Sequence, residues 1–254
     1  MPYNATQNNA LPTNRLKVAA QLKILMFCLL SAMILSVIDR TDVNWDLQNY
    51  HLYGPFSALT GRLGQDFFPA GFQGYLNPTI DLPYYIVKMI WFPNHPILVA
   101  ALAGLPFGFM VFCVFNVARI LLPSHGYVVW CGTTLLGITG ATCLSEVGTT
   151  YDDILIADFI LSALWLLLAS RAPSYTAVAG ICAGCAVGLK FTAAVFMPGL
   201  VVMAILLMPK IKHVISLLAW MTVGFMAVWG WWGALLWQHF GNPLYPMLGH
   251  LFPA

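Results

Sequence analysis

The chain has 254 residues, of which 60% are hydrophobic and 8% are charged, and its formal net charge is +2. A soluble domain typically carries about 25% charged residues, so this composition excludes an ordinary soluble fold. The apolar runs approach the roughly 20 residues that cross a bilayer, unlike the short alternating segments of a membrane barrel. The sequence therefore predicts an all-α, polytopic helical membrane protein, and the weak net charge gives no reason to expect a nucleic-acid partner.

The N-terminal part is expected to be a cytoplasmic tail followed by a retained signal anchor. Residues 1–17 are mostly polar, and Val18–Ile38 is the first long apolar run. This run follows basic residues but lacks a convincing small-residue cleavage site, so we expect it to stay in the mature protein. Residues 18–254 then form a single transmembrane domain.

Residues 39–95 are predicted to form one large first periplasmic loop. Glycine, proline and aromatic residues recur throughout this stretch, and Leu82–Phe92 is too short to span a bilayer. The aromatic side chains are of the kind found at headgroup depth, which indicates short juxtamembrane helices lying in the interface.

Six further apolar runs bring the expected number of spans to seven. They are predicted as helices at about Pro96–Ala118, Gly126–Leu144, Ile154–Ala169, Tyr175–Leu189, Thr192–Met208 and His213–Trp237. Within the fifth of these seven helices, Gly180, Gly184 and Gly188 recur at intervals of four, which indicates close packing against another helix.

The charged residues support this topology. With the N-terminus inside, the cytoplasmic segments hold only basic residues, namely Arg15, Lys17, Lys23, Arg119, Arg171, Lys210 and Lys212. All nine acidic residues fall between Asp39 and Asp158, in the two outer loops or about a turn and a half below the second. Because cytoplasmic loops are enriched in Lys and Arg, we expect both acidic loops on the periplasmic face.

The acid-rich stretch after the first span contains the first candidate site residues. If the chain is helical from Trp45 to Leu59, Asp46 and Tyr50 share one face, and Asp46 could act as a general base on an acceptor hydroxyl. His51 points about 140° from Asp46 on an ideal helix, so it is interpreted as a packing or supporting residue near substrate. Asp39 and Asp42 are expected to be solvated or to cap the next helix.

The second outer loop is predicted to meet the first. We interpret Asp46 and Asp152 as catalytic, and the expected substrate-binding residues are Tyr50, His51, Glu146, Asp153 and Lys190. Lys190 could stabilise a phosphate leaving group, although it could also only extend to the interface. Asp152 and Asp153 could equally favour the N-terminus of the following helix.

A divalent cation is an open alternative. Asp46 with Glu146 or Asp152 would offer the hard oxygen ligands that Mg²⁺ and Mn²⁺ prefer. The spacing of these residues does not define a metal site, and no cofactor is certain.

The order of these features resembles the membrane-embedded C-type glycosyltransferases (GT-C), in particular bacterial galacturonosyltransferases of the lipopolysaccharide core, aminoarabinose transferases and protein mannosyltransferases. Four places carry the resemblance: Asp46 with Tyr50-His51, the stretch from Asn77-Pro78 to Tyr84-Tyr85, Asp152-Asp153, and Gly188-Leu-Lys190. Members of this group usually continue through further spans, so on this resemblance the chain is either truncated at its C-terminus, a split subunit or an inactive remnant.

The resemblance implies an inverting glycosyltransferase in the bacterial inner membrane that works on the periplasmic face. The donor would be a sugar linked to polyprenyl phosphate, the acceptor a lipid, glycan or protein, and the base Asp46. The alternatives are a transporter or flippase for a lipid-linked saccharide, or a non-catalytic membrane subunit. Asp158 and Lys190 keep the transporter open, because both could lie below the interface.

Overall fold

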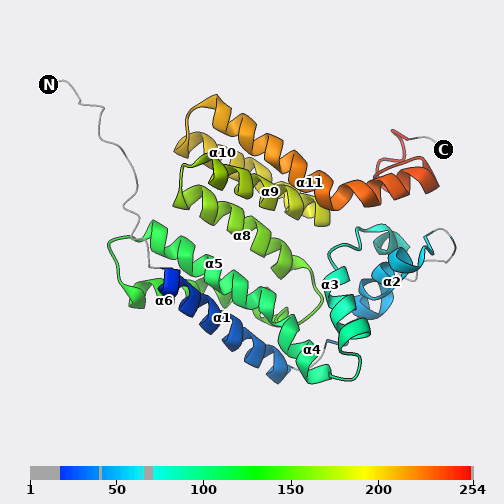
Figure 1. Cartoon of the computed structure of the whole chain (residues 1–254), viewed down its shortest axis with the longest axis horizontal. Helices are drawn as coiled ribbons and strands as arrows, with labels where there is room; N and C mark the ends of the chain where they lie inside the picture. Colours follow the sequence, from blue (N-terminus) through cyan, green and yellow to red (C-terminus); the bar gives the residue numbers. More distant parts are fainter. Residues whose placement is uncertain (1–17, 40–41, 64, 66–70, 253–254) are drawn as a thin grey trace.

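The computed structural model describes residues 18–39, 42–63, 65 and 71–252, and every regular element in them is helical (Figure 1). The expected cytoplasmic tail, residues 1–17, lies outside the described residues. The long helices are α1 (Val18–Asp39), α5 (Leu105–Leu121), α8 (Asp153–Ala169), α9 (Pro173–Leu189), α10 (Met197–Leu207) and α11 (Ile211–Phe240). The all-α prediction is confirmed for this part of the chain.

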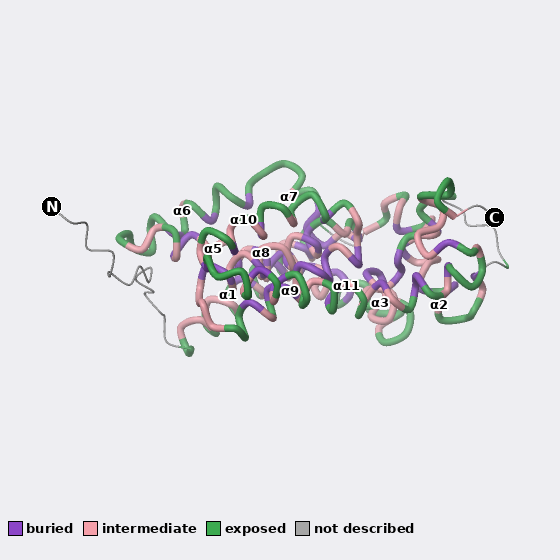
Figure 2. The backbone as a smooth tube through the Cα atoms, turned by 90° about the horizontal axis from the view of Figure 1, so that it is seen from above, coloured by how far each residue is buried: buried purple, intermediate pink, exposed green. Residues whose placement is uncertain are grey.

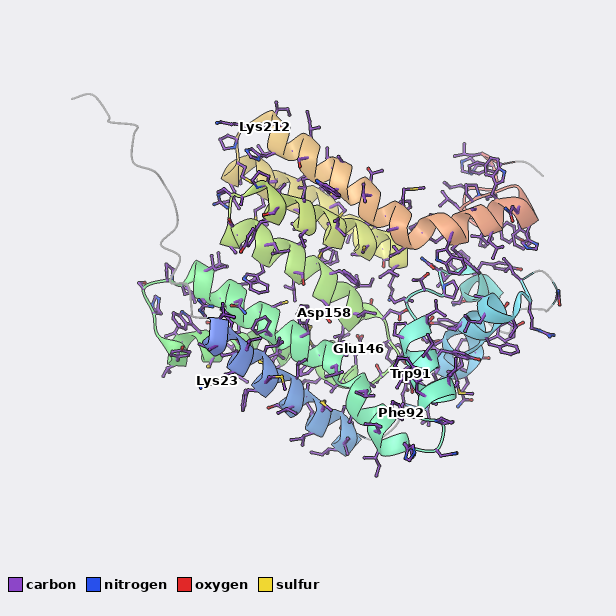
Figure 3. All side chains as sticks on the ribbon, in the orientation of Figure 1. Lys23, Trp91, Phe92, Glu146, Asp158 and Lys212 are labelled. Carbon is purple, nitrogen blue, oxygen red and sulfur yellow. The ribbon has the colours of Figure 1, made fainter. Side chains whose placement is uncertain are left out.

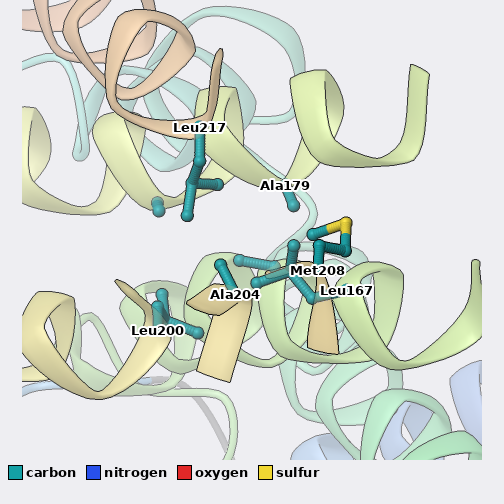
Figure 4. Close-up of a cluster of buried hydrophobic side chains, with 8 residues drawn as sticks. Leu167, Ala179, Leu200, Ala204, Met208 and Leu217 are labelled. Carbon is teal, nitrogen blue, oxygen red and sulfur yellow. The ribbon is translucent and has the colours of Figure 1, made fainter. Parts of the chain in front are cut away.

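The long helices lie side by side in a bundle. α5 packs against α1 and α8, while α9 lies between α8 and α11 (Figure 1). Leucine, alanine and methionine side chains fill the space where α8, α9, α10 and α11 meet, and Figure 4 shows Leu167, Ala179, Leu200, Ala204, Met208 and Leu217 among them. This apolar packing stabilises the end of the bundle that lies far from the acidic loops.

Glycine allows α9 and α11 to approach closely. A Cβ atom at Gly180 would lie 2.7 Å from the carbonyl oxygen of Leu217, and one at Gly188 would lie 2.9 Å from that of Phe225. Gly184 and Gly224 are equally crowded by backbone of the opposite helix. A side chain at any of these positions would push the two helices apart.

Among the described residues, three helical segments are long and apolar enough to cross a membrane: α1, the segment Pro96–Leu121, and α11. The segment Pro96–Leu121 combines α4 (Pro96–Ala103) with α5, which follow each other across Gly104. The other apolar helices are shorter than 18 residues. The predicted count of seven spans is therefore not confirmed.

Two of the predicted spans differ from the observed helices. The expected helix Gly126–Leu144 is divided into α6 (Tyr127–Ile138) and α7 (Ala141–Ser145), because Gly140 adopts an extended conformation between them. The expected helix Thr192–Met208 begins as the 3₁₀-helix η4 (Phe191–Phe196) and continues as α10.

Many apolar side chains on the outside of the bundle are exposed. Phe27 on α1 is 72% exposed, and Val128 and Leu136 on α6 are 88% and 82% exposed. Figure 2 shows these outer helices with exposed residues along much of their length. Such apolar surface is unusual on a soluble monomer and suits contact with lipid.

Short helices connect α1 to α4 and gather near the C-terminal segment (Figure 1). They are η1 (Leu47–His51), α2 (Tyr53–Thr60), η2 (Gly71–Tyr75), α3 (Leu82–Tyr85) and η3 (Ile86–Trp91). The buried Asn77 amide donates hydrogen bonds to the carbonyl oxygens of Gly188 and Val228, at 2.8 and 2.9 Å. These bonds fasten the connecting segment to the C-terminal end of α9 and to the middle of α11.

The bundle has ends of different character. Figure 3 shows Lys23 and Lys212 toward one end, whereas Glu146, Trp91 and Phe92 lie toward the other and Asp158 lies between them. The candidate site lies at the end that carries Glu146.

Candidate functional site

The first part of the site is a helix with an unusual turn. The side chain of Asn44 accepts a hydrogen bond from the Leu47 backbone N–H at 2.7 Å and so caps the helix start. From Leu47 to His51 the chain forms a π-helix, in which the Leu52 N–H bonds to the Leu47 carbonyl five residues earlier. In a π-helix, residues five positions apart lie on nearly the same side of the helix axis, so His51 lies on the side that carries Asp46.

The orientation of His51 relative to Asp46 differs from the one expected on an ideal α-helix. On an ideal α-helix His51 would face away from Asp46, but both residues and Tyr50 line one polar cavity of about 370 Å³. His51 is 2% exposed and its ring lies 4.2 Å from the Tyr50 ring, centroid to centroid. Burial and the nearby Asp46 carboxylate raise the pKa of Tyr50, which therefore keeps its proton and can donate a hydrogen bond.

The second acidic loop is fastened to the first by Asp42. Its Oδ2 atom accepts hydrogen bonds from the backbone N–H and the hydroxyl of Thr150, both at 2.7 Å, and Asp42 also bonds to Asn44. Asp42 was expected to be solvated or to cap a helix, and instead it joins the two loops. Gly148 allows the tight turn before Thr150, because its φ of 72° favours glycine.

At the centre of the site lie one histidine and two carboxyl groups. His51 Nδ1 is 2.6 Å from Asp81 Oδ1 and 4.0 Å from Asp152 Oδ2, and the three side chains are 2%, 10% and 18% exposed. Burial raises the pKa of Asp152 to about 8 and that of Asp81 well above its ordinary value, and it lowers the pKa of His51. Burial therefore disfavours the charged form of each of these three groups, a penalty that a bound cation would offset for the carboxylates.

Lys190 lies beside this cluster, where α9 ends. Its Nζ atom is 2.6 Å from Asp153 Oδ1, and the two side chains are 32% and 58% exposed. An exposed pair of this kind contributes little to stability, about 0–1 kcal/mol, so the ammonium can exchange Asp153 for another anion at small cost.

Three cavities meet at Asp152. The polar cavity is also lined by Asp46, Tyr50, Glu146 and Lys190, and the second, of about 230 Å³, contains Lys190 with the aromatic residues Phe191 and Trp229. The third, of about 410 Å³, is lined mainly by apolar residues, including Tyr84, Val87, Trp91, Leu102 and Phe107. Asp152 lines all three.

All seven residues selected from the sequence line the polar cavity: Asp46, Tyr50, His51, Glu146, Asp152, Asp153 and Lys190. Burial and the Asp153 carboxylate raise the pKa of Glu146. Asp158 lies on α8 and lines none of these three cavities. The structure therefore brings the two acidic loops and the end of α9 to one place.

Sequence reasoning missed Asp81. It lies directly before α3 and is 8% exposed, in hydrogen-bond contact with His51. The available signal was its composition: it is one of only nine acidic residues and stands in an apolar, aromatic stretch, where a carboxyl group is costly to keep.

A metal ion would find a different ligand set from the expected one. In the part of the chain that the structure describes, His51, Asp81 and Asp152 form a group whose ligand atoms lie within 4.8 Å of one another, whereas the expected sets paired Asp46 with Glu146 or Asp152. Asp152 is common to both sets.

Comparisons of the chain with protein-family models, with curated proteins and with solved structures find no match. The resemblance to C-type glycosyltransferases therefore stays a prediction. The functional proposal depends on the geometry of the site.

Proposed function

We propose that this chain is an integral-membrane glycosyltransferase that moves a sugar from a polyprenyl-phosphate donor to a hydroxyl group of a lipid, glycan or protein acceptor. The observation that carries the proposal is the position of Asp152, which lines an apolar cavity, a cavity that contains Lys190 and aromatic side chains, and an acidic cavity at once. A lipid-linked sugar has three parts of matching character: an isoprenoid chain, a phosphate and a polar ring.

The apolar cavity suits the first part of such a donor. Val87, Leu102 and Phe107 line it, and Glu146 and Asp152 stand at its polar side. Pockets for small molecules are mostly apolar with a few polar groups that fix orientation, which is the composition found here. An isoprenoid chain bound there would leave its phosphate beside Asp152 and Lys190.

The proposed reaction is a single displacement at the anomeric carbon. Asp46 takes the proton of the acceptor hydroxyl, the acceptor oxygen forms a bond to the sugar, and the bond from the sugar to the phosphate oxygen breaks. The electron pair of that bond leaves with polyprenyl phosphate, whose negative charge Lys190 stabilises. Because attack and departure occur on opposite faces of the ring, the configuration inverts.

The cellular setting is part of the proposal. Three long apolar helices suit a bilayer, and in the proposed orientation Lys23 and Lys212 are cytoplasmic while the acidic site opens at the periplasmic face of a bacterial inner membrane. Carboxyl groups near the rim of a bundle meet both water and lipid, as a transferase of this kind requires.

A direct experiment compares purified parent protein with Asp46→Asn and a control, Asp39→Asn. Each is given a panel of polyprenyl-phosphate hexoses and pentoses with a membrane-lipid extract, and transferred sugar is measured. We expect transfer by the parent and the control, and a loss of roughly 10²–10⁴-fold in Asp46→Asn, the range that general-base catalysis contributes. Equal rates in parent and Asp46→Asn would remove Asp46 from the mechanism.

A transporter or flippase for a lipid-linked saccharide is the second candidate, favoured by Asp158. This residue is 6% exposed on α8, and its Oδ1 atom has no hydrogen-bond partner among the described residues. Buried acids within a bundle often lie on ion or substrate paths. Translocation of a fluorescent lipid-linked sugar in proteoliposomes, lost in Asp158→Asn, would favour transport over transfer.

A further inference from the structure

We propose that His51, Asp81 and Asp152 form a binding site for a divalent transition-metal cation, Zn²⁺ or Mn²⁺, at the junction of the three cavities. Metal binding at this site is a property separate from sugar transfer, because it depends only on the positions of the three ligand atoms. It differs from the sequence expectation in using a histidine and in using Asp81.

The geometry needs only small side-chain shifts to hold an ion. His51 Nδ1 lies 2.6 Å from Asp81 Oδ1 and 4.0 Å from Asp152 Oδ2, and the three ligand atoms lie within 4.8 Å of one another. Around a tetrahedral ion with bonds of about 2.1 Å, ligand atoms lie about 3.4 Å apart. Side-chain movements of about 1 Å would therefore bring all three atoms to the ion.

Charge and burial also favour a cation. Buried carboxylates are normally paired with a positive charge or bound to a metal. Lys190 forms its direct ion pair with Asp153, and no Lys or Arg ion pair reaches Asp81 or Asp152 in the part of the chain that the structure describes. The ring of His51 is 2% exposed, faces both carboxyl groups through Nδ1, and has no hydrogen-bond partner for Nε2 among the described residues.

The ligand types select the class of ion. An imidazole nitrogen with two carboxylate oxygens suits Zn²⁺ or Mn²⁺, whereas Ca²⁺ and Mg²⁺ prefer oxygen ligands alone. Three protein ligands leave a position for water or a substrate oxygen. Because Asp152 lines the cavities, an ion bound there could stabilise the negative charge on a departing phosphate. This catalytic role rests on the proposed function, whereas metal binding does not.

The test measures metal binding alone. Full-length protein in detergent is stripped with a chelator, dialysed and titrated with Zn²⁺ or Mn²⁺. Bound metal is counted by elemental mass spectrometry, and Mn²⁺ is also followed by electron paramagnetic resonance. We expect one ion per chain in the parent and binding at least tenfold weaker in Asp81→Asn and Asp152→Asn. Asp39→Asn, the same change at an aspartate outside the cluster, should bind as the parent does.

Thermal melting without metal shows which variants fold. If Asp81→Asn does not fold, metal binding by Asp152→Asn, a change at a more exposed residue, tests the site instead. The rise in melting temperature that either ion should produce in the parent gives a second measurement. Binding below one ion per chain, or equal affinity in the parent and in Asp152→Asn, would overturn the site. If the chain binds one ion but transfers no sugar, the metal site stands and the proposed function is contradicted. If the chain transfers sugar but binds no ion, the proposed function stands and the metal site is contradicted.

Discussion

Asp42 Oδ2 accepts hydrogen bonds from both the backbone N–H and the hydroxyl of Thr150, 108 positions later in the chain. The same carboxylate bonds to Asn44, which caps the helix that carries Asp46, Tyr50 and His51. The two acidic loops are therefore joined through Asp42, and the Asn44 amide adds a 3.3 Å hydrogen bond to the Thr150 hydroxyl. Asp42 lines a neighbouring cavity and not the polar cavity itself.

Asp42→Ala should loosen this connection. Hydrogen bonds to a charged group contribute about 1.5–3 kcal/mol each, so we expect the two loops to become more mobile and the free energy of unfolding to fall by at least about 1 kcal/mol. Hydrogen exchange at Thr150 and at Leu47 should accelerate, whereas Asp39→Ala should leave both unchanged. Unchanged exchange in Asp42→Ala would mean that the loops are held by other contacts.

Asn77→Leu should destabilise the fold more than an exposed asparagine change. The substitution removes three hydrogen bonds: the two that the amide donates to the carbonyl oxygens of Gly188 and Val228, and the one that Oδ1 accepts from the Thr79 N–H, at a combined cost of about 2–4 kcal/mol. Asn49→Leu is the matched control, because the Asn49 amide bonds only within its own turn. Thermal melting in detergent measures the difference, and equal melting temperatures would contradict the assigned role of Asn77.

Glu146 should make stability depend on pH. Its pKa in the folded state is raised above the ordinary 4.5, chiefly by burial and then by Asp153, so the folded protein binds a proton that the unfolded chain has released. Stability should therefore be greatest below pH 4.5 and fall as the pH rises through the raised pKa. In Glu146→Gln this loss should disappear, which melting curves from pH 4 to 8 would detect as a flatter profile. An identical profile in both proteins would contradict the raised pKa.

Lys190→Met should weaken donor binding with little effect on stability. The pair with Asp153 is partly exposed and contributes about 0–1 kcal/mol, but the ammonium is proposed to meet the donor phosphate. We expect the KM for the donor to rise about tenfold or more and the KM for the acceptor to stay within twofold. Lys212→Met, which changes a lysine at the opposite end of the bundle, should alter neither. A parallel change in both KM values for Lys190→Met would count against a phosphate contact.

Ala103→Trp should block the apolar cavity, which Ala103 lines. Donors with long isoprenoid chains should lose most of their transfer rate, while donors with the shortest chains should lose less. Val128→Trp, a similar change on the exposed face of α6, should have no such effect. Equal loss for long and short chains would indicate that the cavity does not hold the isoprenoid.

The helical class followed from apolar runs, but the number of spans did not. A run of 15 to 17 apolar residues is short for a bilayer and equally suits a helix packed inside a bundle, as α9 is between α8 and α11. Gly140 then divides an expected helix, because a single glycine inside an apolar run can either continue a helix or end it.

Most of the residues that line the polar cavity could be selected from the sequence, because they are charged or polar side chains in an otherwise apolar chain. The contacts between these residues could not be predicted, because they depend on local helix geometry and tertiary structure that leave no clear signal in the sequence. His51 faces the cavity because of a local π-helix, which residue spacing alone does not predict, and Asp81 reaches His51 only through the folding of the connecting segment. The link from Asp42 to Thr150 spans two loops and likewise required the tertiary structure.

The central claim is that one lipid-linked sugar occupies the apolar and acidic cavities together. Photo-crosslinking with a polyprenyl-phosphate sugar that carries a photoreactive group on its isoprenoid chain tests this most directly, with labelled residues mapped by mass spectrometry. The account predicts labelling at Val87, Leu102 and Phe107, competed by unlabelled donor and reduced in Lys190→Met. Labels spread over the exposed faces of α1 and α6, and equal to those from a polyprenol without phosphate or sugar, would contradict it.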